Sequence, residues 1–257
     1  MEKTILSSSG LTLRFGGLTA INDVGFAIRK GEIAAIIGPN GAGKTTLFNI
    51  ITGIYTPNQG TVCFNDISLA GKSPHEIASM GISRTFQNIR LYGNMTVMEN
   101  VMVGMHSKTR SGIAGSIFRS PRYRKEERFC RTEAEKLLEL TELSPYRYDY
   151  ATSLPYGLQR RLEIARAMAS SPEIILLDEP AAGMNEMETE ALTQFILDIN
   201  RQGFTILLIE HDMRLVMKIC KRIYVLDYGV VISQGTPEEV KRDPKVIEAY
   251  LGKEEEE

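Results

Sequence analysis

The segment "GPNGAGKT", from Gly38 to Thr45, matches the phosphate-binding pattern G-x-x-x-x-G-K-[ST] at every fixed position. It follows the short apolar run "EIAAIIG", which is typical of a buried strand, and it opens a helical pattern. The glycines let backbone N–H groups turn inward around phosphate oxygens, and the helix N-terminus adds partial positive charge. Lys44 can reach the β- and γ-phosphates, and the Thr45 hydroxyl can bind Mg²⁺. The sequence therefore predicts a nucleotide site at this loop.

Two further apolar runs end in residues with suitable chemistry. "IILLDEP" ends in Asp178, which could hold Mg²⁺ or its water shell, and in Glu179, which could polarise a water for in-line attack. Solvated acids at a strand end are the ordinary alternative, but the phosphate loop earlier in the chain favours the functional interpretation. His211 follows "TILLIE" and is either structural or placed to hydrogen-bond the γ-phosphate.

The chain alternates between strand and helix patterns on both sides of a helical middle. "LTLRFGG" and "VGFAIRKGE" predict antiparallel strands, and "GTVCFND" predicts a short strand that ends at an Asn-Asp turn. The β/α alternation resumes at "EIILLDEP", with a helix over 186–201 and a strand in "FTILLIEHD". We therefore predict an α/β core interrupted by a helical subdomain. The expected division is 1–87 with 166–257 for the core and 88–165 for the helical subdomain.

Helix starts are marked by polar residues at characteristic spacing. An N-cap residue followed by proline, or a Ser/Thr residue with Glu three positions later, predicts where a helix begins. These signals are Ser73 with Pro74, Thr96 with Glu99, and Thr236 with Pro237 and Glu239.

Composition limits the class of protein. The chain has 257 residues, is 43% hydrophobic and carries a formal net charge of −2, so it has room for a core and no charge signature of nucleic-acid binding. Its cysteines are far apart with no CxxC pair, which argues against a disulfide framework or a zinc site. No apolar run approaches the roughly 20 residues of a membrane span. We expect a soluble, cytoplasmic protein that relies on another chain for any membrane span.

Three other segments leave alternatives open. Gln87 in "SRTFQNIR" could sense Mg²⁺ or the attacking water, or it is a surface glutamine. Phe15 in "RFGG" could stack on a base or pack in its strand. The basic segment "SKTRSGIAGSIFRSPRYRKEE", 107–127, is expected to be irregular. The basic residues of 108–128 form either a solvated face or a contact with a permease or an anionic membrane. The acidic tail "GKEEEE" is expected to be a frayed end.

The order of these motifs, with "LPYGLQ" between Gln87 and "LLDEP", resembles the ATP-binding subunit of an ABC transporter over nearly the whole chain. "GISRTFQNIRLYGNMTVMENV", "YGLQRRLEIARAMA", "LDEPAAGMN" and "VIEAYLG" are similar to the paired ATPases of branched-chain amino-acid importers. The resemblance implies a P-loop NTPase core of ABC-ATPase type with an antiparallel β subdomain and an inserted helical subdomain. It implies that Phe15 stacks on adenine and that Gln87 joins the core to the helical subdomain and faces the permease. The implied ATP-binding residues are Phe15, Gly38, Pro39, Asn40, Gly41, Ala42, Gly43, Lys44, Thr45 and Thr46. The residues implied to bind Mg²⁺, partly through water, are Thr45, Gln87 and Asp178. The implied catalytic residues are Glu179, His211 and Gln87.

The turn at 154–159 matches the family's signature, normally LSGGQ, in altered form. It reads Leu154, Pro155, Tyr156, Gly157, Leu158 and Gln159, so the usual serine donor is absent. In the family two subunits pack head to tail, and each ATP lies between one phosphate loop and the other subunit's signature. Either this turn works through the backbone of Gly157 and the start of the following helix "LQRRLEIARAMA", or it is degenerate and a partner ATPase supplies most turnover.

The resemblance implies a subunit that binds and hydrolyses ATP with Mg²⁺ to power an importer, with branched-chain amino acids as the expected solute. Its expected partners are permease subunits, a second ATPase subunit and, indirectly, a solute-binding protein, with the chain held at the inner face of the membrane. Another ABC system, such as lipopolysaccharide export, and a soluble DNA-repair ATPase remain alternatives. A small GTPase is disfavoured because no NKxD-type guanine reader follows a strand.

Overall fold

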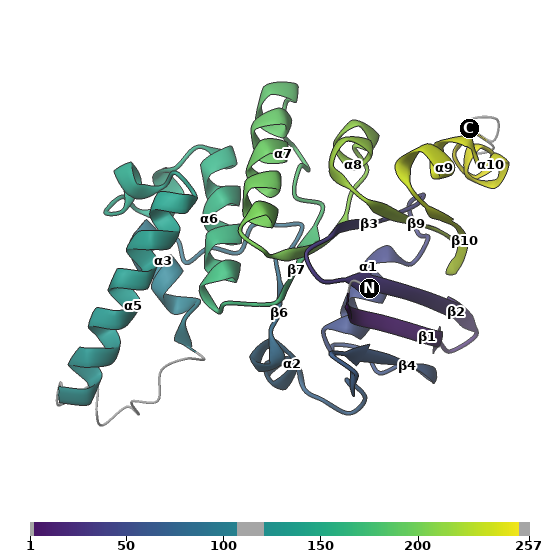
Figure 1. The fold of residues 1–257 in the computed structure, drawn as a ribbon, viewed down its shortest axis with the longest axis horizontal. Helices are drawn as coiled ribbons and strands as arrows, with labels where there is room; N and C mark the ends of the chain where they lie inside the picture. Colours follow the sequence, from purple (N-terminus) through teal and green to yellow (C-terminus); the bar gives the residue numbers. More distant parts are fainter. Residues whose placement is uncertain (1–2, 107–120, 252–257) are drawn as a thin grey trace. The chain divides into compact units, whose positions relative to one another are not determined.

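A computed structural model describes residues 3–106 and 121–251 of the chain (Figure 1). The chain forms two compact units, a core unit of residues 1–84 and 173–257 and a helical unit of residues 85–172. We expected the helical part to end at 165. Helix α6 (Tyr156–Ala169) continues beyond that point, because its apolar residues up to Ala169 pack into the core of the helical unit.

The core unit contains a six-stranded sheet in the order β10-β9-β3-β8-β7-β6. Its strands from β9 to β6 are parallel, and β10 runs antiparallel to β9 at one edge. Every residue of β3, β7 and β8 is buried, as expected for apolar strands covered on both faces. The chain segments that follow these three parallel strands therefore leave the sheet at the same edge. The bounds are β3 (Ile33–Ile37), β6 (Ile82–Arg84), β7 (Ile174–Asp178), β8 (Thr205–Ile209), β9 (Arg222–Asp227) and β10 (Val230–Gly235).

A second, four-stranded antiparallel sheet has the order β2-β1-β4-β5, which confirms the antiparallel strands predicted near the N-terminus. Its strands are β1 (Thr4–Phe15), β2 (Leu18–Arg29), β4 (Gln59–Phe64) and β5 (Ile67–Ser68). Asn65 and Asp66 both have positive φ, 48° and 63°, and form the turn predicted after β4. Side chains of this sheet share one buried cluster with Phe48 of α1 (Lys44–Ile51) and with the six-stranded sheet. In Figure 1 helices α7 (Glu186–Arg201) and α8 (Met213–Ile219) lie on the opposite side of the six-stranded sheet.

The predicted helix starts are confirmed. Capping boxes open α2 (Pro74–Met80), α3 (Val97–Val103) and α9 (Pro237–Arg242), and a fourth opens α7, which spans the residues expected from the sequence. Each box pairs a side-chain oxygen with one backbone N–H and a glutamate with another, so two donors of the first turn are satisfied. The paired residues are Ser73 with Glu76, Thr96 with Glu99, Asn185 with Glu188, and Thr236 with Glu239. Helix α10 (Pro244–Leu251) follows α9.

The helical unit packs α3, α5 (Pro121–Leu140) and α6 around an apolar core that includes Val101, Leu138 and Leu162. Short 3₁₀ turns, η2 (Ser144–Tyr146) and η3 (Ala151–Ser153), connect α5 to α6. The segment 107–127 was expected to be irregular. Residues 107–120 lie outside the described residues, and the expectation is wrong from Pro121 onward. Helix α5 forms there because its buried residues, Cys130, Ala134 and Leu138, recur every four positions on one face.

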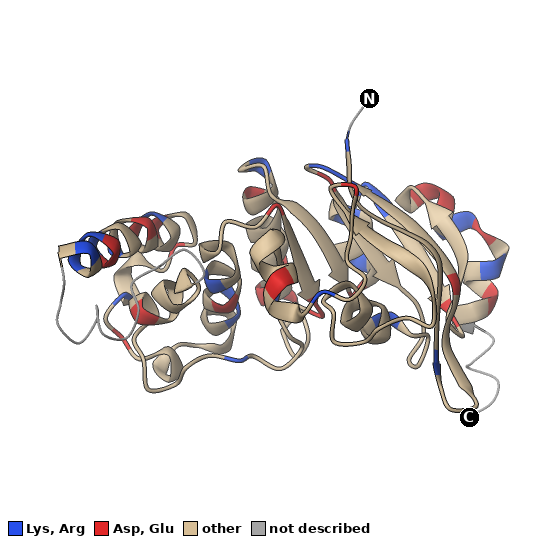
Figure 2. Cartoon of the chain, turned by 90° about the horizontal axis from the view of Figure 1, so that it is seen from below, with Lys and Arg blue, Asp and Glu red and all other residues tan. Residues whose placement is uncertain are grey.

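Basic and acidic residues are interspersed along α5 (Figure 2). Within this helix, Arg122 Nε lies 3.2 Å from Glu126 Oε1, one turn further along. The other end of the basic segment, from Lys108 to Arg119, and the acidic tail lie outside the described residues. Cys63 is half-buried, and Cys130 and Cys220 are buried; all three are free thiols. Among the helices of 3–106 and 121–251, none is both long and apolar enough to cross a bilayer.

Candidate active site

The phosphate loop joins β3 to α1 in a conformation that needs glycine. Gly38, Gly41 and Gly43 have φ values of 147°, 79° and 101°, which lie outside the region that other residues readily adopt. A Cβ on Gly38 would lie only 1.9 Å from the carbonyl oxygen of Leu226. The Lys44 ammonium donates to the carbonyls of Gly38 at 2.7 Å and Pro39 at 2.8 Å. The loop thus holds a buried cation beside the N-terminus of α1, an arrangement suited to phosphate.

A cavity of about 470 Å³ opens beside this loop. Phe15, which is 46% exposed, lies on its wall, and its ring meets that of Tyr55 edge-on with centroids 5.2 Å apart. Glu179 and His211 line the same cavity. The structure therefore brings together the sequence-predicted residues of the core unit that were expected to contact base, phosphates and attacking water. The lining residues are Phe15, Leu18, Thr19, Ala20, Asn40, Gly41, Ala42, Gly43, Lys44, Thr45, Thr46, Glu179, His211 and Tyr228.

Glu179 and His211 form a hydrogen-bonded pair at the ends of adjacent parallel strands. Glu179 Oε1 lies 2.7 Å from His211 Nε2. Glu179 has a φ of 46°, unusual for a residue with a side chain, and its N–H donates to the Ile209 carbonyl at 2.9 Å. A carboxylate held by an imidazole at the edge of a phosphate cavity is suited to accept a proton from a water molecule.

Asp178 is buried at the end of β7, and its Oδ2 lies 2.7 Å from Arg84 Nη2. Thr45 is exposed on the cavity wall. Within the described residues, no cluster of three or more acidic, histidine or cysteine side chains could hold a metal ion without other ligands. Mg²⁺ is commonly held by only one or two protein oxygens together with substrate phosphates, and Thr45 with Asp178 fits that pattern.

The signature turn belongs to the helical unit. Leu154 is extended, with a ψ of 145°, as expected before proline, and Pro155 is the N-cap of α6. We expected Gly157 to precede the helix. It is instead the second helical residue, because Pro155 accepts the N–H groups of both Leu158 and Gln159 at 3.0 Å. The amide of Gly157 therefore lies in the first turn, where the helix itself supplies no acceptor.

Gln87 also belongs to the helical unit and is exposed. Its carbonyl accepts from Arg160 Nη2 at 2.7 Å, and the neighbouring Phe86 carbonyl accepts from Nη1 at 2.8 Å. Arg160 is fully buried and pairs with Glu163 at 2.7 Å. One guanidinium thus ties the Gln87 segment to the helix that the signature turn begins.

Sequence reasoning missed four polar residues near these sites. Arg84, Tyr228 and Arg160 stand in patterns that carry no local signal for a buried pair or a cavity wall. Glu210 could have been flagged, since it is an acid directly after an apolar strand run. Burial raises the pKa of the Glu210 carboxyl above its ordinary value, against hydrogen bonds from backbone N–H groups that favour the ionised form.

Comparisons with known proteins agree with these features. A family model described as "ABC transporter" matches residues 21–182, and one described as "Branched-chain amino acid ATP-binding cassette transporter" matches residues 230–256. The chain is 47% identical over 253 residues to the high-affinity branched-chain amino acid transport ATP-binding protein LivG of Salmonella typhimurium, covering 98% of this chain and 99% of that protein.

Solved structures match across nearly the whole chain as well. The ADP conformation of an ATP-binding cassette of an ABC transporter superposes with a TM-score of 0.85 at 34% identity, covering 97% of this chain and 99% of that one. A dimeric post-hydrolysis state of another ATP-binding cassette, bound to ADP and Pi, has a TM-score of 0.74 at 27% identity, covering 91% and 99%.

Proposed function

This chain belongs to the ABC transporter family as an ATP-binding and ATP-hydrolysing subunit, and we propose that it powers an importer of branched-chain amino acids. The observation that carries the choice of solute is the likeness to a relative named for that transport over nearly the full length of both chains. The match of the C-terminal segment 230–256 to a branched-chain amino-acid family supports the same choice.

We propose that ATP occupies the cavity of the core unit. Phe15 stacks on the adenine, and the loop residues from Gly38 to Thr46 surround the phosphates with backbone N–H groups. The Lys44 ammonium, which donates to two carbonyls of its own loop, exchanges these partners for oxygens of the β- and γ-phosphates. Such an exchange adds charge-assisted hydrogen bonds without moving the helix that carries the lysine.

For hydrolysis, Glu179 is proposed as the general base. Its carboxylate accepts a proton from the attacking water while the bond between the γ-phosphorus and the bridging oxygen of ADP breaks. His211, 2.7 Å from that carboxylate, keeps it oriented and can hydrogen-bond the γ-phosphate. Bound Mg²⁺, which Thr45 and Asp178 would hold, would neutralise the charge on the phosphates.

The signature turn is proposed to act on a second subunit's ATP. Within residues 3–106 and 121–251, helices α1 and α6 each begin with an N-terminus suited to phosphate, and one nucleotide needs only one such helix end. A head-to-tail dimer would place the turn of one subunit, Leu154 to Gln159, against the phosphates held by the other. The second subunit is this chain or a homologous ATPase, and the permease subunits supply the membrane spans.

The proposal is tested by transport. In cells that lack the gene, uptake of labelled leucine, isoleucine and valine should fall about tenfold or more, while uptake of an unrelated sugar stays at its normal rate. The wild-type gene should restore uptake, and a gene carrying Glu179→Gln should not, although its product still binds ATP. Normal uptake of all three amino acids without the gene would contradict the assignment of the solute.

A further inference from the structure

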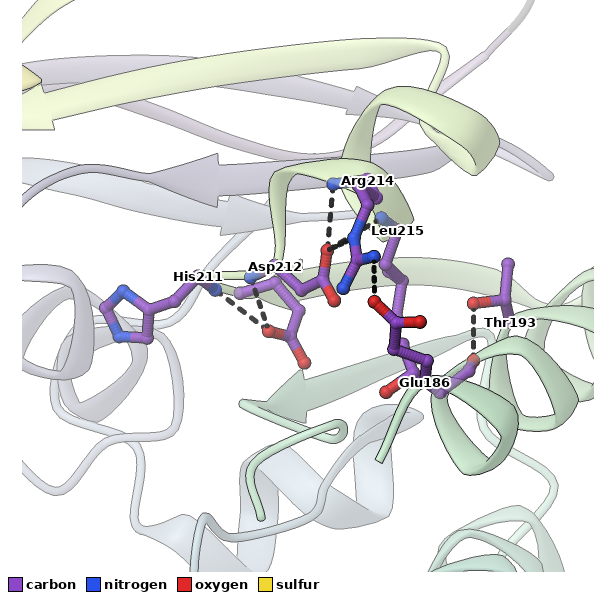
Figure 3. Close-up of polar contacts among 8 residues, drawn as sticks. Glu186, Thr193, His211, Asp212, Arg214 and Leu215 are labelled. Carbon is purple, nitrogen blue, oxygen red and sulfur yellow. Dashed lines mark hydrogen bonds and ion pairs between the residues drawn. The ribbon is translucent and has the colours of Figure 1, made fainter. Parts of the chain in front are cut away.

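Glu210 joins the two loops that flank the proposed catalytic pair. It follows β8, is 3% exposed, and accepts hydrogen bonds through both carboxylate oxygens. Oε1 accepts from the N–H of Ala181 at 2.7 Å, and Oε2 accepts from the N–H groups of His211 at 2.8 Å and Asp212 at 3.2 Å. Figure 3 shows the last two contacts as dashed lines that run from the backbones of His211 and Asp212 to one carboxylate.

The two loops start at different strands. Ala181 lies two residues after Glu179 in the loop that follows β7, whereas His211 follows β8. The strand pairing ends at Asp178 and Ile209. Beyond it the Glu179 N–H still donates to the Ile209 carbonyl and the Glu179 side chain meets His211, and Glu210 adds a buried link further along, to the N–H of Ala181. The left-handed φ of 46° at Glu179 needs surroundings that hold it.

Burying a carboxylate at this position costs free energy of desolvation. Burial opposes the charged form, yet a protonated carboxyl would have to turn an O–H towards a backbone N–H group. Only the ionised form accepts from all three amides at once, and hydrogen bonds to an ionised acceptor are stronger and shorter than neutral ones. The side chain is therefore suited to fixing the geometry of two loops rather than to packing alone.

We propose that Glu210 is a positioning residue for ATP hydrolysis, which holds the loop of Glu179 against the turn of His211 so that their side chains keep one geometry. This inference rests on the proposed roles of Glu179 and His211. Both of those residues line the cavity, whereas Glu210 acts through them from a buried position.

The first test is Glu210→Gln in the full chain. Glutamine keeps the size, but its single carbonyl can serve one loop while its NH₂ group faces the N–H donors of the other. We expect kcat to fall about tenfold or more, since small displacements of catalytic groups are costly. The KM for ATP should stay within about twofold, because Lys44 begins α1 and the phosphate loop leads into it from β3, so neither belongs to the two loops that Glu210 joins. Unchanged kcat would overturn the inference.

Glu32→Gln is the matched control. Glu32 is also buried, at 5% exposure, and accepts the N–H of Arg29 at 2.6 Å, at the start of β3 rather than at its phosphate-loop end. The Glu32→Gln variant should be less stable than the parent, because a buried carboxylate has lost its charge, but its kcat should be unchanged. An equal loss of kcat in both variants would show that Glu210 is only structural and would overturn the inference.

The double-mutant cycle with His211→Ala separates positioning from folding. If Glu210 acts through the placement of Glu179 and His211 relative to each other, removing His211 removes the geometry that Glu210 protects. Glu210→Gln should then reduce kcat less than about twofold further in the His211→Ala background. The same fold-loss in both backgrounds would overturn the inference. Retained turnover in Glu179→Gln and His211→Ala alone would instead show that the proposed catalytic pair is wrong, and the inference would fail with it.

If the Glu210→Gln variant shows no cooperative melting transition and therefore does not fold, Glu210→Asp is tested in its place. Aspartate retains the charge but is one methylene shorter, so it cannot reach both loops equally. A fall in kcat at unchanged KM that disappears in the His211→Ala background supports positioning. Full kcat in Glu210→Asp, or an equal fall in both backgrounds, overturns it.

Discussion

The two units of this chain each present a helix N-terminus suited to phosphate, and they build it in different ways. In the core unit α1 begins after Gly43 in a left-handed conformation, and its first residue is the buried cation Lys44. In the helical unit α6 begins after Pro155, with extended backbone, and its first residue is the half-exposed Tyr156. Neither N-cap residue makes a side-chain capping hydrogen bond, so both first turns keep amides for a ligand.

This contrast in charge and backbone assigns the two sites different roles. The site at α1 combines the Lys44 ammonium with backbone amides of a glycine-rich loop. It can bind a free nucleotide, because the ammonium adds a full positive charge to the partial charge of the helix N-terminus. The turn at α6 offers backbone amides and a phenol hydroxyl, which carry no full charge. It is therefore suited to contact a phosphate that another subunit already holds.

The largest effect is expected in the helical unit, for Arg160→Met. Arg160 and Glu163 are 0% and 1% exposed, and the guanidinium also serves the carbonyls of Phe86 and Gln87. Removing one partner leaves a buried charge uncompensated, which costs about 3–5 kcal/mol. Urea unfolding should show this loss in the helical unit, while the isolated variant still binds ATP through the core unit.

Lys136→Met is the control for that change. Lys136 forms an ion pair with Glu133 on α5, with side chains 67% and 37% exposed, and its loss should cost no more than about 1 kcal/mol. Replacing Arg160 and Glu163 together by methionine should recover part of the loss, since no lone charge is then buried. If Arg160→Met alone abolishes ATP binding, the two units do not act separately and the comparison fails.

The next effect concerns the core unit. Glu179→Gln keeps the shape of the proposed base and removes its ability to accept a proton, so kcat should fall about 10²-fold or more. ATP binding should persist because Lys44 is untouched, and the ATP-bound dimer should accumulate in gel filtration with Mg-ATP. An unchanged rate of phosphate release would reject the role of Glu179.

Gly157→Asp then tests the turn of the helical unit. Aspartate in the first turn of a helix is favourable for the helix itself, so a loss of activity would not come from unfolding. Its carboxylate would repel a phosphate approaching the amides of α6, and turnover with ATP-driven dimerisation should fall about tenfold or more. Gly157→Asn, of nearly equal size and no charge, should lose much less. Equal turnover in the parent and Gly157→Asp would mean that the turn is vestigial.

The elements of the core unit could be predicted from the sequence more accurately than those of the helical unit. The phosphate loop, the strand ends at Asp178 and His211, and the helix over 186–201 were foreseen, since each has a local pattern or a cap. The start of α6 was misplaced because Pro155 as N-cap gives the same sequence appearance as a proline in a preceding loop. The helical stretch from Pro121 was missed because its apolar positions are sparse among charges.

The partners of buried polar groups could not be foreseen at all. Arg84 meets Asp178 only because β6 and β7 pair in parallel, and Arg160 meets Gln87 only through the packing of the helical unit. Glu210 meets Ala181 across two loops. Such pairs depend on contacts far apart in the chain, for which a single sequence carries no pattern.

The smallest expected effect, for Pro155→Ser, decides whether the turn at α6 works through its backbone. Serine is a better N-cap residue than proline, but removing the proline also frees the unfolded chain, so the free energy of unfolding should change by less than about 1 kcal/mol. If the amides of the first turn already bind the partner's phosphate, the added hydroxyl is not needed, and turnover should change less than about threefold. Pro155→Ala is the control, since it removes the ring without adding a donor. Turnover is measured as phosphate release at saturating Mg-ATP. A turnover about tenfold or more above the parent in the serine variant alone would show that the turn lacks a side-chain donor. The distinction between a charged site at α1 and a backbone site at α6 would then not hold.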